Sequence, residues 1–200
     1  MLKSALKLCI RSFAFLKRLS ITIQNNIAII CNSVELSSTI ILNGPIYISN
    51  KGQMSFGHNV KFNSTIDANP ITQRRCVLYT TKNGTLTIGD NTGMSGCTIY
   101  CTNKISIGKD VLIGAGTNIY DTDFHSLSLK DRLDGDTKIK NEPVIIDDYC
   151  FIGANVTILK GVKIGKGSII AAGSVVTKNV GENELWGGNP ASLIRNNINV

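Results

Sequence analysis

His125 is the residue of this sequence best suited to acid–base chemistry. It is one of two histidines and lies in a polar, irregular stretch at residues 120–143, YDTDFHSLSLKDRLDGDTKIKNEP. Imidazole exchanges protons near neutral pH, which suits a general base. Asp121 and Asp123 precede it by four and two residues, and a carboxylate bonded to one ring nitrogen would leave the other free to accept a proton. We expect Asp123 to orient the ring, with Asp121 as the alternative. The competing interpretation is a set of solvated loop residues without a catalytic role.

The polar stretch interrupts a strict repeat of six residues. An aliphatic side chain recurs at every sixth position after it, and a small or β-branched one follows each by four residues. The aliphatic positions are Ile146, Ile152, Ile158, Ile164, Ile170 and Val176, and the later positions are Cys150, Val156, Val162, Ser168, Ser174 and Val180. Before the stretch, Ile107, Ile113 and Ile119 keep the same period. Such a period fits neither an α-helix nor a simple strand. It indicates very short strands joined by tight turns, winding into a triangular coil with three hexads per turn.

The repeat also predicts where the coil lies. The period is clear over residues 85–181 outside the polar stretch and fainter over 40–62. It is lost over 63–84, where NPITQRRC is typical of a loop that leaves the coil. Long loops without secondary structure of their own are usually functional, which favours a role for 120–143. The predicted segments are an N-terminal helical segment at 1–35, an all-β coil at 36–181 and a C-terminal tail at 182–200.

The late repeats carry a resemblance to a known family. They read VIIDDYCFIGANVTILKGVKIGKGSIIAAGSVVTKNV at residues 144–180, and GGNPASLIR follows at 187–195. This pattern resembles the hexapeptide-repeat O-acetyltransferases, which include maltose, galactoside and polysaccharide acetyltransferases, and the resemblance covers about residues 88–197. It implies a left-handed parallel β-helix that forms homotrimers, with acetyl-CoA as co-substrate and active sites in the clefts between subunits. It also implies that His125 is the general base. Ser95 resembles a polar residue that faces the acceptor, and we assign Asp121 to the acceptor side as well.

The same resemblance implies a groove for coenzyme A along the last coils. Small side chains there would let the pantetheine arm approach the backbone. Phe151 stands where the family usually has tryptophan, which weakens the aromatic contact. Lys178 and Arg195 match cations near the nucleotide phosphates, although each alone would be an ordinary exposed cation. The predicted cofactor-binding residues are Phe151, Ala154, Ala172, Thr177, Lys178 and Arg195, and no metal is expected.

Composition argues against several other functions. The net charge of +7 comes mostly from Lys3, Lys7, Arg11, Lys17 and Arg18, so the rest of the chain has no basic face for nucleic acid. The six cysteines form no C-x-x-C pair, which indicates small buried side chains in a reducing compartment and a cytoplasmic protein. Direct transfer is therefore favoured over a cysteine nucleophile, which would need a thiol of low pKa beside a base. A γ-type carbonic anhydrase would need three zinc-binding histidines per site.

Residues 2–19, LKSALKLCIRSFAFLKRL, predict an amphipathic helix. Its basic residues share one arc of the helix, and its apolar residues lie opposite. The helix could pack its apolar face on the first coil and cover the open strand edge. Alternatively it could rest on the anionic inner face of a membrane, where lipid-linked glycans would be made.

The most specific function that these features support is acetyl-CoA-dependent O-acetylation of a sugar hydroxyl. A role in surface polysaccharide biosynthesis, of a capsule or O-antigen, fits the resemblance best. An N-acyltransferase of an amino sugar or sugar nucleotide is the alternative, because it would use the same apparatus. A non-catalytic β-helix protein would leave His125 and the late-coil pattern unexplained.

Overall fold

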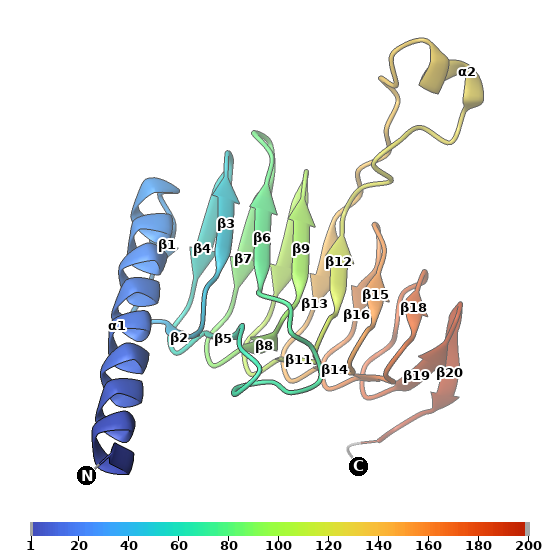
Figure 1. Cartoon of the computed structure of the whole chain (residues 1–200). Coiled ribbons are helices and arrows are strands. Elements are labelled where there is room, and N and C mark those ends of the chain that lie inside the picture. Colours follow the sequence, from blue (N-terminus) through green and yellow to red (C-terminus); the bar gives the residue numbers. More distant parts are fainter. Residues whose placement is uncertain (1, 199–200) are drawn as a thin grey trace.

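The computed structural model describes residues 2–198, and for residues 2–10 it describes the backbone alone. Short strands wind into a three-sided coil whose faces are parallel sheets, and a long helix lies at the N-terminal end (Figure 1). In each turn the chain runs from sheet A to sheet B to sheet C and back to sheet A. We name the three edges of the coil the AB, BC and CA corners, after the sheets that they join.

Each sheet takes one strand from each turn of the coil. Sheet A contains β1 (Glu35–Leu36), β4 (Gln53–Phe56), β7 (Thr85–Ile88), β10 (Lys104–Ile107), β13 (Val144–Ile146) and β16 (Lys163–Ile164). Sheet B contains β2 (Ile41–Asn43), β5 (Lys61–Asn63), β8 (Gly93–Ser95), β11 (Leu112–Ile113), β14 (Phe151–Ile152), β17 (Ile169–Ile170), β19 (Leu185–Gly188) and β20 (Ala191–Arg195). Sheet C contains β3 (Tyr47–Asn50), β6 (Val77–Thr80), β9 (Thr98–Cys101), β12 (Asn118–Tyr120), β15 (Thr157–Ile158) and β18 (Val175–Val176).

The core is built from the residues that keep the six-residue period. Ile152, Ile164 and Ile170 are completely buried, as are Val156 and Ser168 from the positions four residues later. Each strand is so short that it contributes one or two side chains to the interior, and the same position of the next turn stacks directly on it. The predicted coil is therefore confirmed over its C-terminal half.

Strands β2 to β5 form the coil predicted at 40–62, and one segment after them differs from the prediction. Strand β6 lies within the segment 63–84, which was expected to be a loop, and its Leu78 is fully buried. The excursion from the coil is shorter, running from residue 64 to 76 at the BC corner. Its insertion breaks the spacing between β5 and β6, so the period could not be followed across it.

The second excursion agrees with the prediction. It runs from residue 121 to 143 at the CA corner, between β12 and β13. It contains the short helix α2 (Leu129–Leu133), and it projects away from the coil (Figure 1). We call it the His125 loop.

Helix α1 (Leu2–Cys31) is longer than the helix predicted at 2–19. Its C-terminal half contacts the first turn through Asn25, whose side chain bonds to Gly44 O at 3.0 Å and accepts from Ile46 N at 3.1 Å. Residues 11–20 are all exposed. Packing on the coil, the first of the two interpretations, is found for the C-terminal part of the helix, where Ile29 lies against the core, and is not found for residues 11–20. The part of the predicted apolar face at residues 2–10 lies outside the described side chains.

Candidate active site

The base of the His125 loop is fixed by Asp121. This side chain is completely buried, and its two carboxylate oxygens accept hydrogen bonds from the backbone N–H groups of Thr102 and Asn103, each at 2.7 Å. Thr102 Oγ1 donates to it as well, at 2.8 Å. Because both oxygens are occupied inside the protein, the prediction that Asp121 binds substrate or orients His125 is wrong. Its role is to hold the turn before β10 against the loop.

Asp123 also has a partner other than His125. Its Oδ1 lies 2.7 Å from Nζ of Lys160, which comes from the next turn of the coil. Its backbone N–H donates to Lys140 O at 3.1 Å, across the two arms of the loop. The expected pairing of Asp123 with His125 is therefore wrong. Asp123 anchors the loop to the coil at the CA corner.

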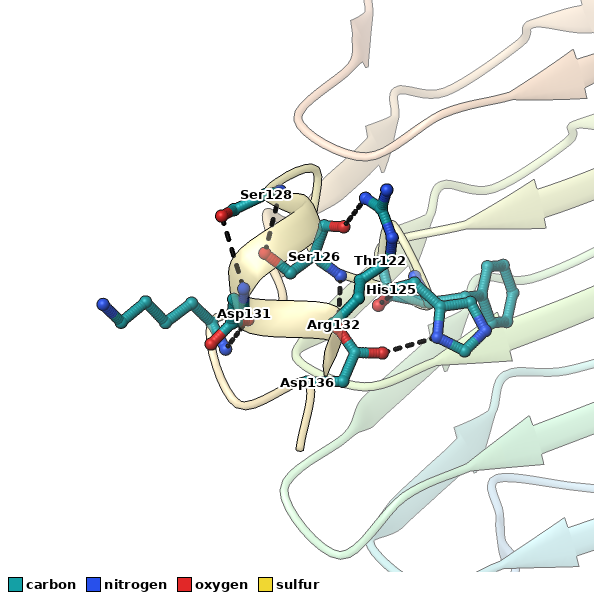
Figure 2. Close-up of polar contacts among 9 residues, drawn as sticks. Thr122, His125, Ser126, Ser128, Asp131, Arg132 and Asp136 are labelled. Carbon is teal, nitrogen blue, oxygen red and sulfur yellow. Dashed lines mark hydrogen bonds and ion pairs between the residues drawn. The ribbon is translucent and has the colours of Figure 1, made fainter. Parts of the chain in front are cut away.

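The carboxylate that contacts His125 belongs to Asp136. Its Oδ2 lies 2.5 Å from Nδ1 of His125, and its Oδ1 accepts from the backbone N–H of Ser126 at 2.6 Å (Figure 2). The Ser126 N–H, and after it His125, hold the pKa of Asp136 below its ordinary value. Asp136 is thus a carboxylate at neutral pH, and it places the imidazole proton on Nδ1. The Nε2 atom is left free to accept a proton, on a side chain that is 74% exposed.

A second carboxylate gives the loop its shape. Asp131 accepts from Lys138 N at 2.8 Å and from Thr137 Oγ1 at 3.1 Å, and these bonds, led by Lys138, lower its pKa. Arg132 Nη1 donates to Ser126 O at 2.6 Å, so Ser126 is held by Arg132 at its carbonyl and by Asp136 at its N–H (Figure 2). The loop is therefore organised by its own polar contacts, without a hydrophobic core.

Sequence reasoning missed Asp136 because it lies 11 residues after His125 in a segment without a period. The sequence Asp134-Gly135-Asp136, typical of a turn, was the available signal.

Two of the predicted cofactor residues, Ala154 and Ala172, lie at the BC corner, and the predicted acceptor residue Ser95 lies there too. Ser95 ends β8 there, and its Oγ accepts from Asn63 Nδ2 at 3.2 Å. In the following turns this position is occupied by Gly114, Gly153 and Ala171, so the corner continues without large side chains. A Cβ added to Gly153 would lie 2.5 Å from the backbone N of Ala172, which shows how closely successive turns approach. Ser95 and this line of small residues share one corner of the coil.

The other four predicted cofactor residues lie away from this corner, on sheet B or at the CA corner. Phe151 on β14 is 46% exposed, and Ala154 lies in the turn after it. Thr177 and Lys178 follow β18 at the CA corner and are exposed, and Arg195 ends β20 in sheet B. Phe151, Lys178 and Arg195 are thus open to solvent, where an aromatic ring and two cations could contact a nucleotide.

One chain does not bring His125 and the small residues of the BC corner together. The His125 loop leaves from the CA corner, whereas Ser95 and Ala172 lie at the BC corner, at the other end of the sheet C strands (Figure 1). An acceptor hydroxyl placed on His125 would therefore be separated from the BC corner of the same chain by the width of sheet C.

The four buried cysteines of the described part of the chain offer no accessible nucleophile, and the exposed Cys31 ends helix α1 at the N-terminal end of the coil. Cys97, Cys101 and Cys150 are buried, and burial raises the pKa of Cys101 to about 12 and that of Cys150 to about 11. Cys76 is also fully buried, although its contact with Cys97 lowers its pKa to about 7. Among the residues whose side chains the structure describes, no group of three histidine, cysteine or acidic side chains could hold a metal ion. No helix within residues 2–198 is long and apolar enough to cross a membrane.

Comparison with known proteins places the chain in a family. Residues 143–178 match the family model described as the hexapeptide repeat of succinyl-transferase. A hexapeptide-repeat containing acetyltransferase of Vibrio cholerae is 32% identical, with 70% of this chain and 73% of that chain covered and a TM-score of 0.55. The same protein in complex with acetyl coenzyme A superposes with 36% identity, 60% and 64% coverage and a TM-score of 0.54.

A curated relative is a putative acetyltransferase of Saccharomyces cerevisiae, which is 42% identical over 92 residues, or 46% of this chain and 45% of its own. The matched segment spans about half the length of such curated relatives. The similarity to the solved structures confirms the left-handed parallel β-helix. By its repeats, its coil and its identity to the Vibrio cholerae protein, this chain belongs to the hexapeptide-repeat acetyltransferase family.

Proposed function

We propose that the protein transfers an acetyl group from acetyl-CoA to a sugar hydroxyl, with His125 as the general base. The contact of His125 Nδ1 with Asp136 carries this proposal, because it leaves Nε2 exposed as a proton acceptor. Two further structural relatives support the substrate class. A galactoside acetyltransferase crystallised with coenzyme A is 30% identical, and a maltose O-acetyltransferase of Clostridium difficile is 26% identical.

The reaction is a direct transfer. Acetyl-CoA supplies the acetyl group as a thioester. His125 Nε2 takes the proton of the acceptor hydroxyl while the hydroxyl oxygen bonds to the acetyl carbon. As the carbon–sulfur bond breaks, the imidazolium returns the proton to the sulfur. Asp136 stabilises the imidazolium through Nδ1, so it is a positioning residue that does not touch the substrates.

The BC corner fits the donor. A pantetheine arm needs small side chains beside it and backbone groups for hydrogen bonding, and Gly153, Ala154 and Ala172 provide both. Phe151 would contact the adenine ring, and Lys178 and Arg195 would bind the phosphates. Ser95 lies on the acceptor side of this corner, whereas Thr177 lies beside Lys178 at the CA corner.

A homotrimer would complete the site. The His125 loop and the small residues of the BC corner lie at opposite ends of the sheet C strands of one chain. If neighbouring coils stand side by side, the projecting His125 loop of one subunit can reach the BC corner of the next. Such a heterologous contact closes into a ring of three. Each active site would then take the donor groove from one subunit and the base from another.

N-acetylation of an amino sugar or sugar nucleotide is the second candidate. A 2,3,4,5-tetrahydropyridine-2,6-dicarboxylate N-acetyltransferase of Clostridium perfringens is 55% identical over 53 residues, although these are only 26% of this chain. The same base could deprotonate an ammonium or amine acceptor. The product decides between the candidates, since mild alkali hydrolyses an acetyl ester and leaves an acetamide intact.

We also propose that the enzyme works in the cytoplasm at the inner face of a membrane, in surface polysaccharide biosynthesis. Helix α1 presents Phe13, Leu16, Ile23 and Ile27 to solvent, each at least half exposed. At 100° per residue these side chains share one side of the helix. Lys17 and Arg18 line a groove on the side of the coil. An exposed apolar face with basic residues and no acidic ones is typical of helices that lie in an anionic membrane surface.

One experiment tests the catalytic proposal. Purified protein is incubated with acetyl-CoA and a panel of sugars, sugar nucleotides and oligosaccharides, and the released thiol is measured together with the acetylated product. We expect release that depends on one class of acceptor and that falls when His125 is replaced by alanine. Thiol release without any acetylated sugar, or equal turnover by the alanine variant, would refute it.

A further inference from the structure

An aromatic ladder covers the outer face of sheet C. Tyr79, Tyr100 and Tyr120 occupy the same position on β6, β9 and β12. They point outward because their neighbours Leu78 and Ile99 point into the core. The Tyr79 and Tyr100 rings are stacked, with centroids 4.7 Å apart and an angle of 1° between their planes.

The His125 loop rests on this ladder through Phe124. The Phe124 ring lies 4.9 Å from Tyr100 and 5.2 Å from Tyr120, measured between centroids. Its backbone φ is +61°, which is strained for a bulky residue, and its N–H donates to Thr122 Oγ1 at 3.1 Å. Strain of this kind persists only where contacts hold it, and it lies directly before His125. The aromatic surface and the base are therefore fixed relative to one another.

A small pocket opens beside these rings at the CA corner. Its volume is about 270 Å³, just below the range of roughly 300–1,000 Å³ that is usual for small-molecule sites. Tyr100 and Phe124 provide an aromatic wall, and Asn83, Thr102 and Asn141 provide polar groups around it. We call it the Asn83 pocket.

Two of the polar groups have hydrogen-bonding capacity to spare. Thr102 Oγ1 is bonded to Asp121. Among the described residues no hydrogen bond uses the side-chain amide of Asn83 or of Asn141. Each amide can donate two hydrogen bonds and accept two. The pocket thus combines an apolar aromatic surface with free amides that both donate and accept.

We propose that the Asn83 pocket binds a sugar ring of the acceptor. A pyranose has a face of polarised C–H groups, which suits the negative face of an aromatic ring, and hydroxyl groups at its edge, which suit side-chain amides. The pocket lies at the other end of sheet C from Ser95, so it is a separate subsite on the subunit that supplies His125. This inference rests on the proposed function and adds the residues that select the acceptor.

Binding of sugars to the whole protein tests the inference without relying on catalysis. Saturation-transfer NMR is recorded for methyl glycosides and short oligosaccharides with the wild type, Asn83→Leu and Lys82→Ala. Lys82 is the exposed neighbour of Asn83 and does not line the pocket, so its variant is the matched control. Thermal melting shows whether each variant is folded. We expect sugar signals with the wild type and Lys82→Ala, and their loss with Asn83→Leu.

Kinetics then separate this inference from the proposed function. Asn83→Leu should raise the acceptor KM by about threefold to tenfold, the worth of one hydrogen bond, while kcat and the KM for acetyl-CoA stay near wild type. Phe124→Leu should raise the acceptor KM, whereas Phe124→Tyr, which keeps an aromatic ring, should leave the acceptor KM near the wild-type value. If the wild type acetylates a sugar and Asn83→Leu has an unchanged acceptor KM, the pocket is refuted and the proposed function stands. Equal sugar signals with wild type and Asn83→Leu, or none with either, also overturn the pocket.

Discussion

Asp136 Oδ2 lies 2.5 Å from His125 Nδ1, and the same carboxylate binds the backbone N–H of the residue that follows the histidine. The two bonds fix the imidazole ring at two points, through its own nitrogen and through the backbone beside it. A short loop without a core thereby holds one side chain in a defined orientation. Catalysis by a general base depends on such orientation, because the proton must lie within hydrogen-bonding reach of the base.

Replacing the two residues should separate the base from its support. His125→Ala should lower kcat by about 10²–10⁴, the usual worth of a positioned general base, with little change in acetyl-CoA affinity. Asp136→Asn should cost less, because the base remains although its tautomer is no longer enforced. Asp134→Asn, two residues before Asp136 and exposed, is the control and should keep wild-type turnover. Steady-state kinetics with the preferred acceptor measure all three, and a larger loss for Asp136→Asn than for His125→Ala would contradict the assignment.

The ordering of the loop should depend on pH through Asp136. Hydrogen bonding to Ser126 and His125 lowers its folded-state pKa. A carboxyl group whose pKa is lower in the folded than in the unfolded state stabilises the folded protein at pH values above its unfolded-state pKa, near 3.9. This contribution is lost as the pH falls through the folded-state pKa. The amide NMR shift of Ser126 should therefore titrate with a midpoint below the ordinary aspartate range. In Asp136→Asn this titration should vanish. A midpoint at or above the ordinary aspartate pKa would show that Asp136 does not make these hydrogen bonds in solution.

The buried thiols should be inert. The pKa of Cys101 is raised to about 12 and that of Cys150 to about 11, both chiefly by burial, so almost no thiolate forms at pH 8. Native protein treated with iodoacetamide should remain unlabelled at both positions by peptide mass spectrometry, whereas unfolded protein should be labelled. Cys150→Ala should retain kcat within about twofold, since direct transfer does not use a thiol. Loss of turnover in a folded Cys150→Ala variant would instead support a covalent intermediate.

The coil was predictable because its packing is local in sequence. Each side of the coil requires one inward aliphatic side chain. One repeat of six residues is therefore enough to predict that Ile152 and Ile164 point inward. Strand β6 was missed because the excursion at 64–76 has no fixed length, and the period gives no means of finding the strand beyond it. Leu78 is as deeply buried as Ile152, but no regular spacing leads to it.

The candidate site was predictable only in part, for a related reason. His125 stood out because it interrupts the period. Its partner could not be chosen by distance along the chain, since loop conformation depends on individual hydrogen bonds such as those of Asp131. Asp121 and Asp123 are nearer to His125 in sequence, yet the first is used inside the coil and the second pairs with Lys160. The surface residues Lys178 and Arg195 were reached through resemblance, since an exposed cation carries no local signal of its ligand.

Helix α1 should bind anionic membranes. Phe13 and Leu16 are 72% and 62% exposed, and replacing both with glutamate should remove apolar area and add repulsion from an anionic surface. Cosedimentation with vesicles of phosphatidylcholine and phosphatidylglycerol should fall at least about tenfold. Leu133→Glu changes an equally exposed apolar residue in the His125 loop and is the control. If wild-type protein does not sediment with these vesicles, the membrane proposal is wrong.

Mixed trimers should show that each active site is shared between subunits. His125→Ala removes the base, and Ala172→Trp should block the donor groove at an exposed position of the BC corner without touching the loop. Either variant alone should be nearly inactive. When the two chains are co-expressed and assemble at random, a cleft that takes its loop from one chain and its groove from another is intact in roughly one case in four. Activity should therefore return to about a quarter of the wild-type value, measured per site. If a single chain formed the whole site, every chain in the mixture would carry one defect and activity would stay at the level of the variants. Light scattering on the same samples checks that trimers have formed. Inactive mixed trimers would refute shared active sites. A wild-type protein that is active as a monomer would refute the trimer itself.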